Sequence, residues 1–87
     1  MNKYQQEPEE VIDLHGHTTR EAEAILRTLL EKSEFAHIRI IVGKGNHSKS
    51  GPVLRDFVRG YLTQRNIRFN QSKIQDGGEG SLEVYSS

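Results

Sequence analysis

Two short segments of the sequence concentrate the side chains that could carry out chemistry. The first is DLHGH, residues 13–17, and the second is IIVGKGNHSKSG, residues 40–51, where a histidine lies among glycines, lysines and serines. Histidine takes up and releases a proton near neutral pH, and a nearby aspartate can orient its ring. Glycines let the backbone approach a ligand closely, and lysines attract an anion. Together these residue types indicate acid–base chemistry at a phosphate group.

Hydrophobic periodicity predicts the elements that would position these two segments. Apolar alternation predicts strands over 11–15, 37–43, 67–71 and 82–86. Apolar residues at helical spacing predict one helix from Thr18 to about Ser33 and a second helix that starts near Ser50. Thr18 and Glu21 have capping-box spacing, and Pro52 suits the first turn of a helix because its missing amide hydrogen would be unpaired there.

The predicted order βαβαββ restricts the fold. Crossover connections are right-handed, so the first two strands should lie parallel, with their carboxyl ends at one edge of the sheet. The last connection is short enough for a hairpin, which predicts a mixed sheet. Alternation places apolar residues on one face and polar residues on the other, although Ile41 fits this pattern poorly. We therefore predict an α/β (α+β) two-layer sandwich, with two helices on one face of a four-stranded sheet. Residues 1–10 are expected to form a flexible leader and residues 11–87 one domain.

The charges are segregated along a chain whose net charge is zero. Residues 1–36 carry a net charge of −4, residues 37–73 carry +7, and the last fourteen residues carry −3. This distribution suggests a surface that faces a polyanion, the alternative being charges that merely solvate the surface. The chain has no cysteine and no apolar run near the ~20 residues of a membrane span, and its first residues do not resemble a signal peptide. A soluble cytoplasmic protein without a membrane partner is the expectation.

Ligands of open parallel sheets bind beyond the carboxyl ends of the strands, where the two loaded segments are expected to converge. The start of the second helix would add free amides and the positive end of its dipole. The candidate catalytic residues are Asp13, His15 and His47. The candidate phosphate or nucleic-acid contacts are Gly43, Lys44, Gly45, Asn46, Ser48, Lys49, Gly51, Arg55, Arg39 and Arg68. In the alternative interpretation the glycines serve only turns, the lysines face water and His47 is a surface histidine.

A metal site is a further alternative for the same segments. Asp13 with His15, His17 and His47 offers ligand types that a transition metal accepts. Lysines in the same loop would compete with a cation, so we predict no metal site.

The motifs resemble those of the Smr (small MutS-related) domain family, and the chain looks like a stand-alone small member of it. VIDLHGHTTREAEAIL is similar to the family's LDLHG-x-x-x-x-EA opening, and IIVGKGNHSKSGPVLRDFVRGYL is similar to its HGKG-x-H-S…G-x-LR segment. The closing GGEGSLEV completes a resemblance that covers residues 9–86. It departs from many relatives at Val42, where they have histidine, so no role transfers to that position.

The resemblance implies a βαβαββ sandwich like the C-terminal domain of a bacterial translation initiation factor. It also implies nucleic-acid binding and, in many members, endonuclease activity on DNA or RNA, including messenger RNA on stalled ribosomes. Members that cut RNA carry D-x-H at the end of the first strand, which here is Asp13-Leu14-His15, and the G-x-G-x-H signature spans Gly43 to His47.

RNA cleavage is the first functional hypothesis, and it needs no metal or cofactor. His15, oriented by Asp13, and His47 would act as the base and the acid around attack by the 2′-hydroxyl, while Lys44 and the loop amides stabilise the developing charge. DNA nicking would instead need an activated water, with a divalent cation as the possible cofactor. A non-catalytic module that binds a nucleic-acid backbone, RNA or DNA and including ribosome-associated RNA, is the third hypothesis. A small nucleotide pocket ranks lower, because few aromatic side chains are available to stack on bases. The oligomeric state and the identity of the base stay open.

Overall fold

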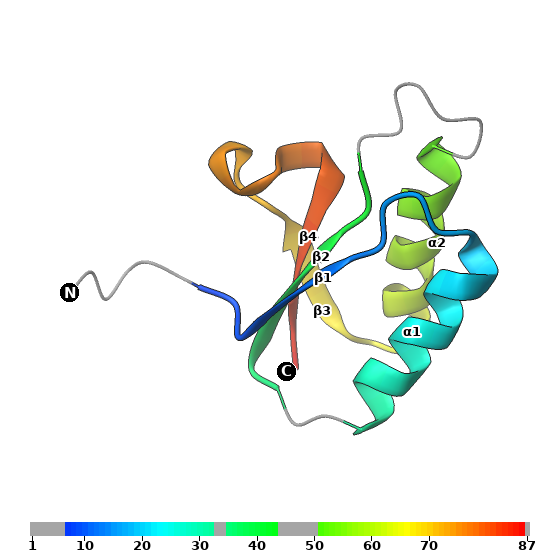
Figure 1. The fold of residues 1–87 in the computed structure, drawn as a ribbon. Helices are drawn as coiled ribbons and strands as arrows, with labels where there is room; N and C mark the ends of the chain where they lie inside the picture. Colours follow the sequence, from blue (N-terminus) through cyan, green and yellow to red (C-terminus); the bar gives the residue numbers. More distant parts are fainter. Residues whose placement is uncertain (1–6, 33–34, 44–50, 87) are drawn as a thin grey trace.

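Two helices cover one face of a four-stranded sheet in the computed structural model, which describes residues 7–32, 35–43 and 51–86 (Figure 1). The elements in chain order are β1 (Glu10–Asp13), α1 (Thr19–Lys32), β2 (His37–Ile41), α2 (Gly51–Gln64), β3 (Arg68–Gln71), the short 3₁₀ helices η1 (Ile74–Asp76) and η2 (Gly78–Gly80), and β4 (Ser81–Tyr85). The predicted order of strands and helices is confirmed.

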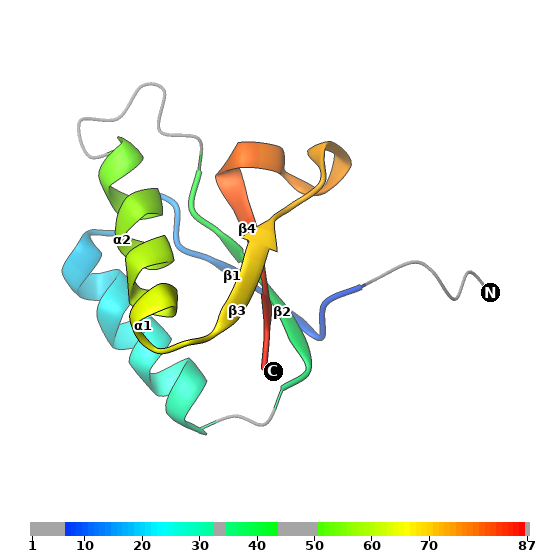
Figure 2. The ribbon, with the colours of Figure 1, turned by 180° about the vertical axis from the view of Figure 1, so that it is seen from behind.

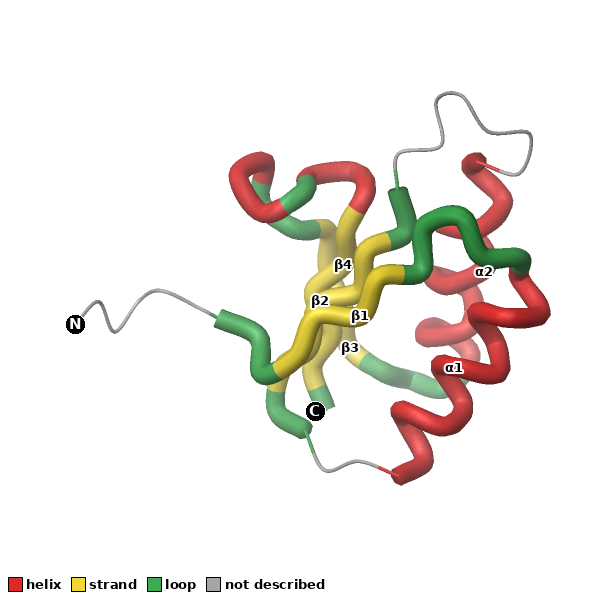
Figure 3. Tube along the Cα trace, in the orientation of Figure 1, coloured by secondary structure: helices red, strands yellow, loops and turns green. Residues whose placement is uncertain are grey.

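The sheet has the strand order β1-β2-β4-β3. β1 and β2 are parallel, and β4 runs antiparallel to both of its neighbours, so the sheet is mixed as predicted. The carboxyl ends of β1, β2 and β3 consequently share one edge. Figure 3 shows the loops after β1 and β2 and the η1–η2 connection leaving the sheet at this edge.

Side-chain alternation sorts the two faces of the sheet as the sequence predicts. Both helices lie on the apolar face, as the view from behind also shows (Figure 2). The buried apolar residues are Leu14, Ala22, Leu26, Ile38, Ile40, Val42, Leu54, Val58, Tyr61, Leu62, Leu82 and Val84. Ile41 alternates with Ile40 and Val42, is half-buried, and lies on the polar face opposite Asp13 in the β1–β2 register. None of the helices in the described ranges is long and apolar enough to cross a membrane.

The start of α1 has the predicted capping box. The Thr18 backbone amide donates to Glu21 Oε1 at 2.9 Å, and the Glu21 amide donates to Thr18 Oγ1 at 3.1 Å. Two amides that the helix cannot pair internally are thereby satisfied. The cap thereby fixes where the segment that follows β1 ends and α1 begins.

The connection between β3 and β4 is more structured than a simple hairpin turn. Its two 3₁₀ helices meet at Gly77 and Gly78, whose φ angles are 121° and 54°. A Cβ atom on Gly77 would lie 2.7 Å from Ser81 Cβ, so this position requires glycine for both backbone and space. The connection reaches back toward the end of β2, where it contacts the candidate site.

Candidate active site

The segment after β1 brings Asp13 and His15 into direct contact. Asp13 Oδ1 accepts the His15 backbone amide at 3.0 Å and lies 2.8 Å from His15 Nδ1. The spacing of two residues along a strand had left this contact open, since such side chains stand ~7 Å apart. β1 ends at Asp13, however, and the chain turns through Gly16, whose φ is 84°. The two side chains can therefore meet.

The contact determines the protonation geometry of His15. The hydrogen bond from the His15 side chain is the largest cause that lowers the pKa of the Asp13 carboxyl below its usual value of 3.8, and the hydrogen bond from the His15 backbone amide is the next. An ionised carboxylate can only accept hydrogen bonds, so Nδ1 of His15 carries the hydrogen. Nε2 is then the ring atom that can exchange a proton with a ligand. The His15 side chain is 69% exposed, which leaves it accessible to a large substrate.

Gly43 brings the end of β2 against His15. A Cβ atom on Gly43 would lie 3.3 Å from His15 Cβ, and the φ of Gly43 is 80°. The amides of Val42 and Gly43 both donate to the Gly80 carbonyl, at 2.8 and 3.0 Å. We call this junction of the Asp13–His15 turn, Gly43 and Gly80 the rim. The rim joins parts of all three sequence motifs.

The remaining residues of the glycine–lysine loop lie outside the described residues. These are Lys44, Gly45, Asn46, His47, Ser48, Lys49 and Ser50. Gly51 opens α2, whose first turn contains no acidic residue that would oppose an anion there. The described chain therefore fixes where the loop starts, at Gly43 beside His15, and where α2 begins. The role of His47 stays a prediction.

Arg55 and Arg59 project from α2 around a hollow of about 370 Å³. Arg55 Nη1 lies 3.5 Å from Glu79 Oε1, and the Glu79 side chain is 68% exposed. An exposed pair of this length contributes little energy, so Arg55 can exchange it for a phosphate. The guanidinium of Arg59 lies over the Phe69 ring at 5.5 Å.

The two arginines predicted on the polar face of the sheet differ in environment. Arg68 is exposed and lies 4.8 Å above the Tyr85 ring centroid. Arg39 is only 16% exposed, with Nε 2.6 Å from Glu83 Oε2 and Nη2 3.6 Å from Asp76 Oδ2. Arg39 is thus paired within the polar face rather than open to solvent, because the β2–β4 register places Glu83 directly opposite it.

His17, weighed above as a metal ligand, turns its ring toward the backbone. Its Nδ1 lies 3.2 Å from the Leu14 carbonyl, to which it can donate. Among the residues that the structure describes, no group of three or more histidine, aspartate, glutamate or cysteine side chains is arranged to hold a metal ion.

Comparison with known proteins shows the family to which this chain belongs. The model of the Smr domain matches residues 12–87. This chain belongs to the Smr domain family. The Smr domain of Thermus thermophilus MutS2 superposes with a TM-score of 0.76 at 25% identity, over 90% of this chain and 98% of that one. Smr domains are nucleic-acid-binding modules that are generally associated with nuclease activity.

Two longer proteins contain a related segment. Human NEDD4-binding protein 2 is 33% identical over 75 residues, which is 76% of this chain. An uncharacterized protein of Treponema pallidum is 38% identical over 58 residues, or 63% of this chain. The match covers 4% of the first protein and 29% of the second, so this chain corresponds to a small part of either.

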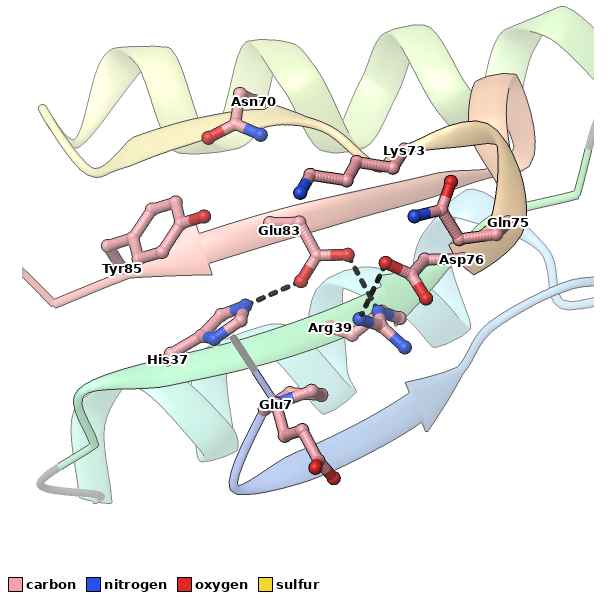
Figure 4. A pocket seen from close by; sticks show the side chains of 10 residues that line it. Glu7, His37, Arg39, Asn70, Lys73, Gln75, Asp76, Glu83 and Tyr85 are labelled. Carbon is pink, nitrogen blue, oxygen red and sulfur yellow. Dashed lines mark hydrogen bonds and ion pairs between the residues drawn. The ribbon is translucent and has the colours of Figure 1, made fainter. Parts of the chain in front are cut away.

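Sequence reasoning missed a buried polar cluster in this Smr domain. Glu83 accepts hydrogen bonds from His37 Nε2 and Arg39 Nε (Figure 4). It also accepts one from Ser72 Oγ, and Ser72 shares a further hydrogen bond of 2.9 Å with Ser81. Burial acts to raise the pKa of Glu83, but the hydrogen bonds from Ser72, Arg39 and His37 outweigh it and lower that pKa from 4.5. We call Glu83 with these three donors the Glu83 cluster. Alternation in the sequence shows that His37 and Arg39 share one face of β2 and that Glu83 and Tyr85 share one face of β4. Only the pairing of β2 with β4 shows that these two sets of side chains are in contact.

Proposed function

We propose that this Smr domain is an endonuclease that cleaves RNA without a metal ion. The observation that supports the proposal is the bond between Asp13 Oδ1 and His15 Nδ1 at the exposed rim, which leaves Nε2 of His15 free for a ligand. Gly43 lies against the same histidine and leads into the glycine–lysine loop. A strand phosphate at the rim would be within reach of His15 and of that loop.

The chemistry follows from the RNA backbone itself. A base removes the proton of the 2′-hydroxyl, whose oxygen attacks the adjacent phosphorus. The bond from phosphorus to the 5′-oxygen breaks, and an acid protonates that oxygen, which leaves a 2′,3′-cyclic phosphate and a 5′-hydroxyl. We assign the two proton-transfer roles to His15 and His47, with Lys44 and the loop amides stabilising the negative charge that develops on the phosphate oxygens.

Asp13 has two roles in this scheme. It holds Nδ1 protonated, so that Nε2 is the atom facing the substrate, and its negative charge stabilises the imidazolium that forms when Nε2 takes a proton. Asp13→Asn keeps the size of the side chain but removes the charge. Cleavage by the asparagine variant should fall while its affinity for RNA is retained.

Labelled RNA and DNA of several structures, incubated with and without EDTA, test the proposal. We expect RNA cleavage in EDTA with cyclic phosphate ends, and a fall of ~10²–10⁴-fold in the His15→Ala/His47→Ala double variant. His17→Ala is the matched control, since it removes a histidine of the same turn whose ring faces the Leu14 carbonyl. A strict requirement for magnesium, or cleavage of DNA at the same rate, would refute metal-free attack by the 2′-hydroxyl.

The same samples separate the enzyme from a non-catalytic binding module. If the wild-type domain binds RNA and never cleaves it, while the double variant binds equally well, the domain is a binder. In either case affinity should fall linearly with salt on logarithmic axes, because bound phosphates release counterions. Arg55→Ala should make that slope shallower by about one unit, since the hollow beside Arg55 and Arg59 offers cations outside the proposed catalytic pair.

A further inference from the structure

A pocket of about 490 Å³ lies on the polar face of the sheet, opposite the helices (Figure 4). His37, Arg39 and Glu83 form its floor, and side chains of β3, of the η1 segment and of the segment before β1 form its walls. Its volume falls in the range of ~300–1,000 Å³ that is typical of small-molecule sites. None of the residues proposed for catalysis lines this pocket.

The pocket is chemically unsuited to a phosphate. Its lining holds three carboxylates, from Glu7, Asp76 and Glu83, against two permanent cations, Arg39 and Lys73. Arg39 is already paired with Glu83 and Asp76. A dianionic group would meet more negative than positive charge. A ligand group without negative charge is favoured on electrostatic grounds.

Hydrogen-bonding groups with free capacity point into this space. Figure 4 shows the side chains of Asn70, Lys73 and Gln75 directed over the floor. Within the part of the chain that the structure describes, the side chains of Lys73 and Gln75 make no hydrogen bond or ion pair. Asn70 Nδ2 donates to the Gln71 carbonyl at 3.0 Å, which leaves its Oδ1 to accept. The three side chains thus offer both donors and acceptors, the groups that pair with the edge of a nucleobase.

The aromatic ring of the pocket is not available for stacking. Tyr85 lies against the His37 ring with centroids 4.8 Å apart, and the Arg68 guanidinium lies 4.8 Å from the same Tyr85 ring. A base in this pocket would therefore be recognised along its hydrogen-bonding edge.

The pocket lies close to the rim on the same face. Asp13 is in register with Ile41, which follows the pocket residue Arg39 by two positions on the adjacent strand. Arg39 therefore lies ~7 Å along the sheet from the level of Asp13, and Asn70, on β3, lies three inter-strand spacings or ~14 Å across the sheet from β1. A strand whose phosphate lies at the rim can place a base a few nucleotides further along over the pocket.

We propose that this pocket receives one unstacked nucleobase of the bound strand and reads its edge with Asn70, Lys73 and Gln75. The inference rests on the proposed function, because it assumes a nucleic-acid strand at the rim. In this arrangement the polar face of the sheet determines the base preference, while the rim and α2 contact the phosphate backbone of the nucleic acid.

Nuclear magnetic resonance of the ¹⁵N-labelled protein tests the pocket separately from catalysis. The probes are single-stranded 2′-O-methyl hexanucleotides of each base, which resist attack by a 2′-hydroxyl, and an abasic hexamer with the same backbone. We expect all of them to shift the amides of His15 and Gly43. Only base-bearing probes should shift the side-chain NH₂ signals of Asn70 and Gln75. Shifts at the rim without shifts at those two side chains overturn the inference and leave the proposed function standing.

Substitutions give the second readout. Asn70→Ala with Gln75→Ala should lower the preference for base-bearing over abasic probes by ~10-fold, as expected for two lost hydrogen bonds. Gln64→Ala, which removes an exposed amide from α2, is the matched control. An unchanged preference in the double variant refutes base recognition by these side chains.

The remaining outcomes are also decisive. If free nucleosides shift the Asn70 and Gln75 signals and oligonucleotides do not, the pocket binds a free nucleotide and the inference is wrong. If base-bearing probes shift those signals but unmodified RNA is never cleaved, the pocket stands and the nuclease proposal fails. If the probes shift neither the rim nor the pocket, both fail.

Discussion

Replacing Glu83 by glutamine tests how much the Glu83 cluster stabilises the fold. The carboxylate is 8% exposed, and one of its oxygens accepts from both Arg39 and Ser72 while the other accepts from His37. A glutamine oxygen can keep the first two bonds. Its NH₂ group can donate to Nε2 of His37 if that ring changes tautomer. The substitution therefore removes mainly the charge.

The expected cost follows from the difference between charged and neutral hydrogen bonds. Bonds to a charged group contribute ~1.5–3 kcal/mol and neutral bonds ~0.5–1.5 kcal/mol, so we expect a loss of about 2 kcal/mol in the free energy of unfolding. For a domain of this size each kcal/mol shifts the melting temperature by ~4–8 °C. Glu83→Gln should consequently melt ~8–16 °C below the wild-type protein at pH 7, as followed by circular dichroism.

The pH dependence gives this prediction a signature that a packing defect lacks. The folded pKa of Glu83 lies below its ordinary value of 4.5, so the stability contributed by its charge is present above pH 4.5 and is lost as the pH falls through the folded value. The gap between wild type and variant should be full at pH 7 and should shrink below pH 4.5.

The matched control is Glu79→Gln, which changes a carboxylate that is 68% exposed and lies 3.5 Å from Arg55. An exposed pair contributes at most ~1 kcal/mol, so this variant should melt close to the wild type. Equal melting of the Glu83→Gln and Glu79→Gln proteins at pH 7, or a gap that persists undiminished at pH 3, would refute the stabilising role of the buried charge.

Three further predictions concern the fold and use thermal or urea unfolding. Gly77→Ala should destabilise the protein by ~1–3 kcal/mol, because the φ of Gly77 is 121° and the new methyl group would lie 2.7 Å from Ser81 Cβ. Gly60→Ala is the matched control: Gly60 lies in α2, a Cβ atom there would have no neighbour within 4 Å, and the substitution should stabilise the protein by ~0.5–1 kcal/mol. Stability changes of the same sign in the two variants would contradict this reasoning. Thr18→Ala removes the capping hydroxyl of α1 and should cost about 1 kcal/mol, and an unchanged melting temperature would show that the cap is dispensable. Leu26→Ala leaves a cavity at a fully buried site and should lower the free energy of unfolding by ~2–5 kcal/mol, which urea unfolding would show as a lower midpoint. A loss smaller than that of Thr18→Ala would contradict this prediction.

Local patterns in the sequence were sufficient to predict the elements and most of the topology. The capping box at Thr18 and the apolar alternation through Ile38 and Ile40 depend on neighbours within a few residues, and the structure shows both. Crossover handedness then placed the carboxyl ends of β1 and β2 at one edge, which brought Gly43 beside His15. These features need no knowledge of distant pairing.

Contacts across the sheet depended on the tertiary structure. Arg39 was a candidate phosphate contact in the sequence, but Glu83 faces it from a strand 44 residues away and takes up its charge. The contact between Asp13 and His15 was likewise undecided until the end of β1 was located at Asp13. A periodic pattern shows which face a side chain occupies, but the partner across that face is set by strand order and register. Those arise from packing of the whole chain, because pairing distant segments is favourable only once the common core between them is buried.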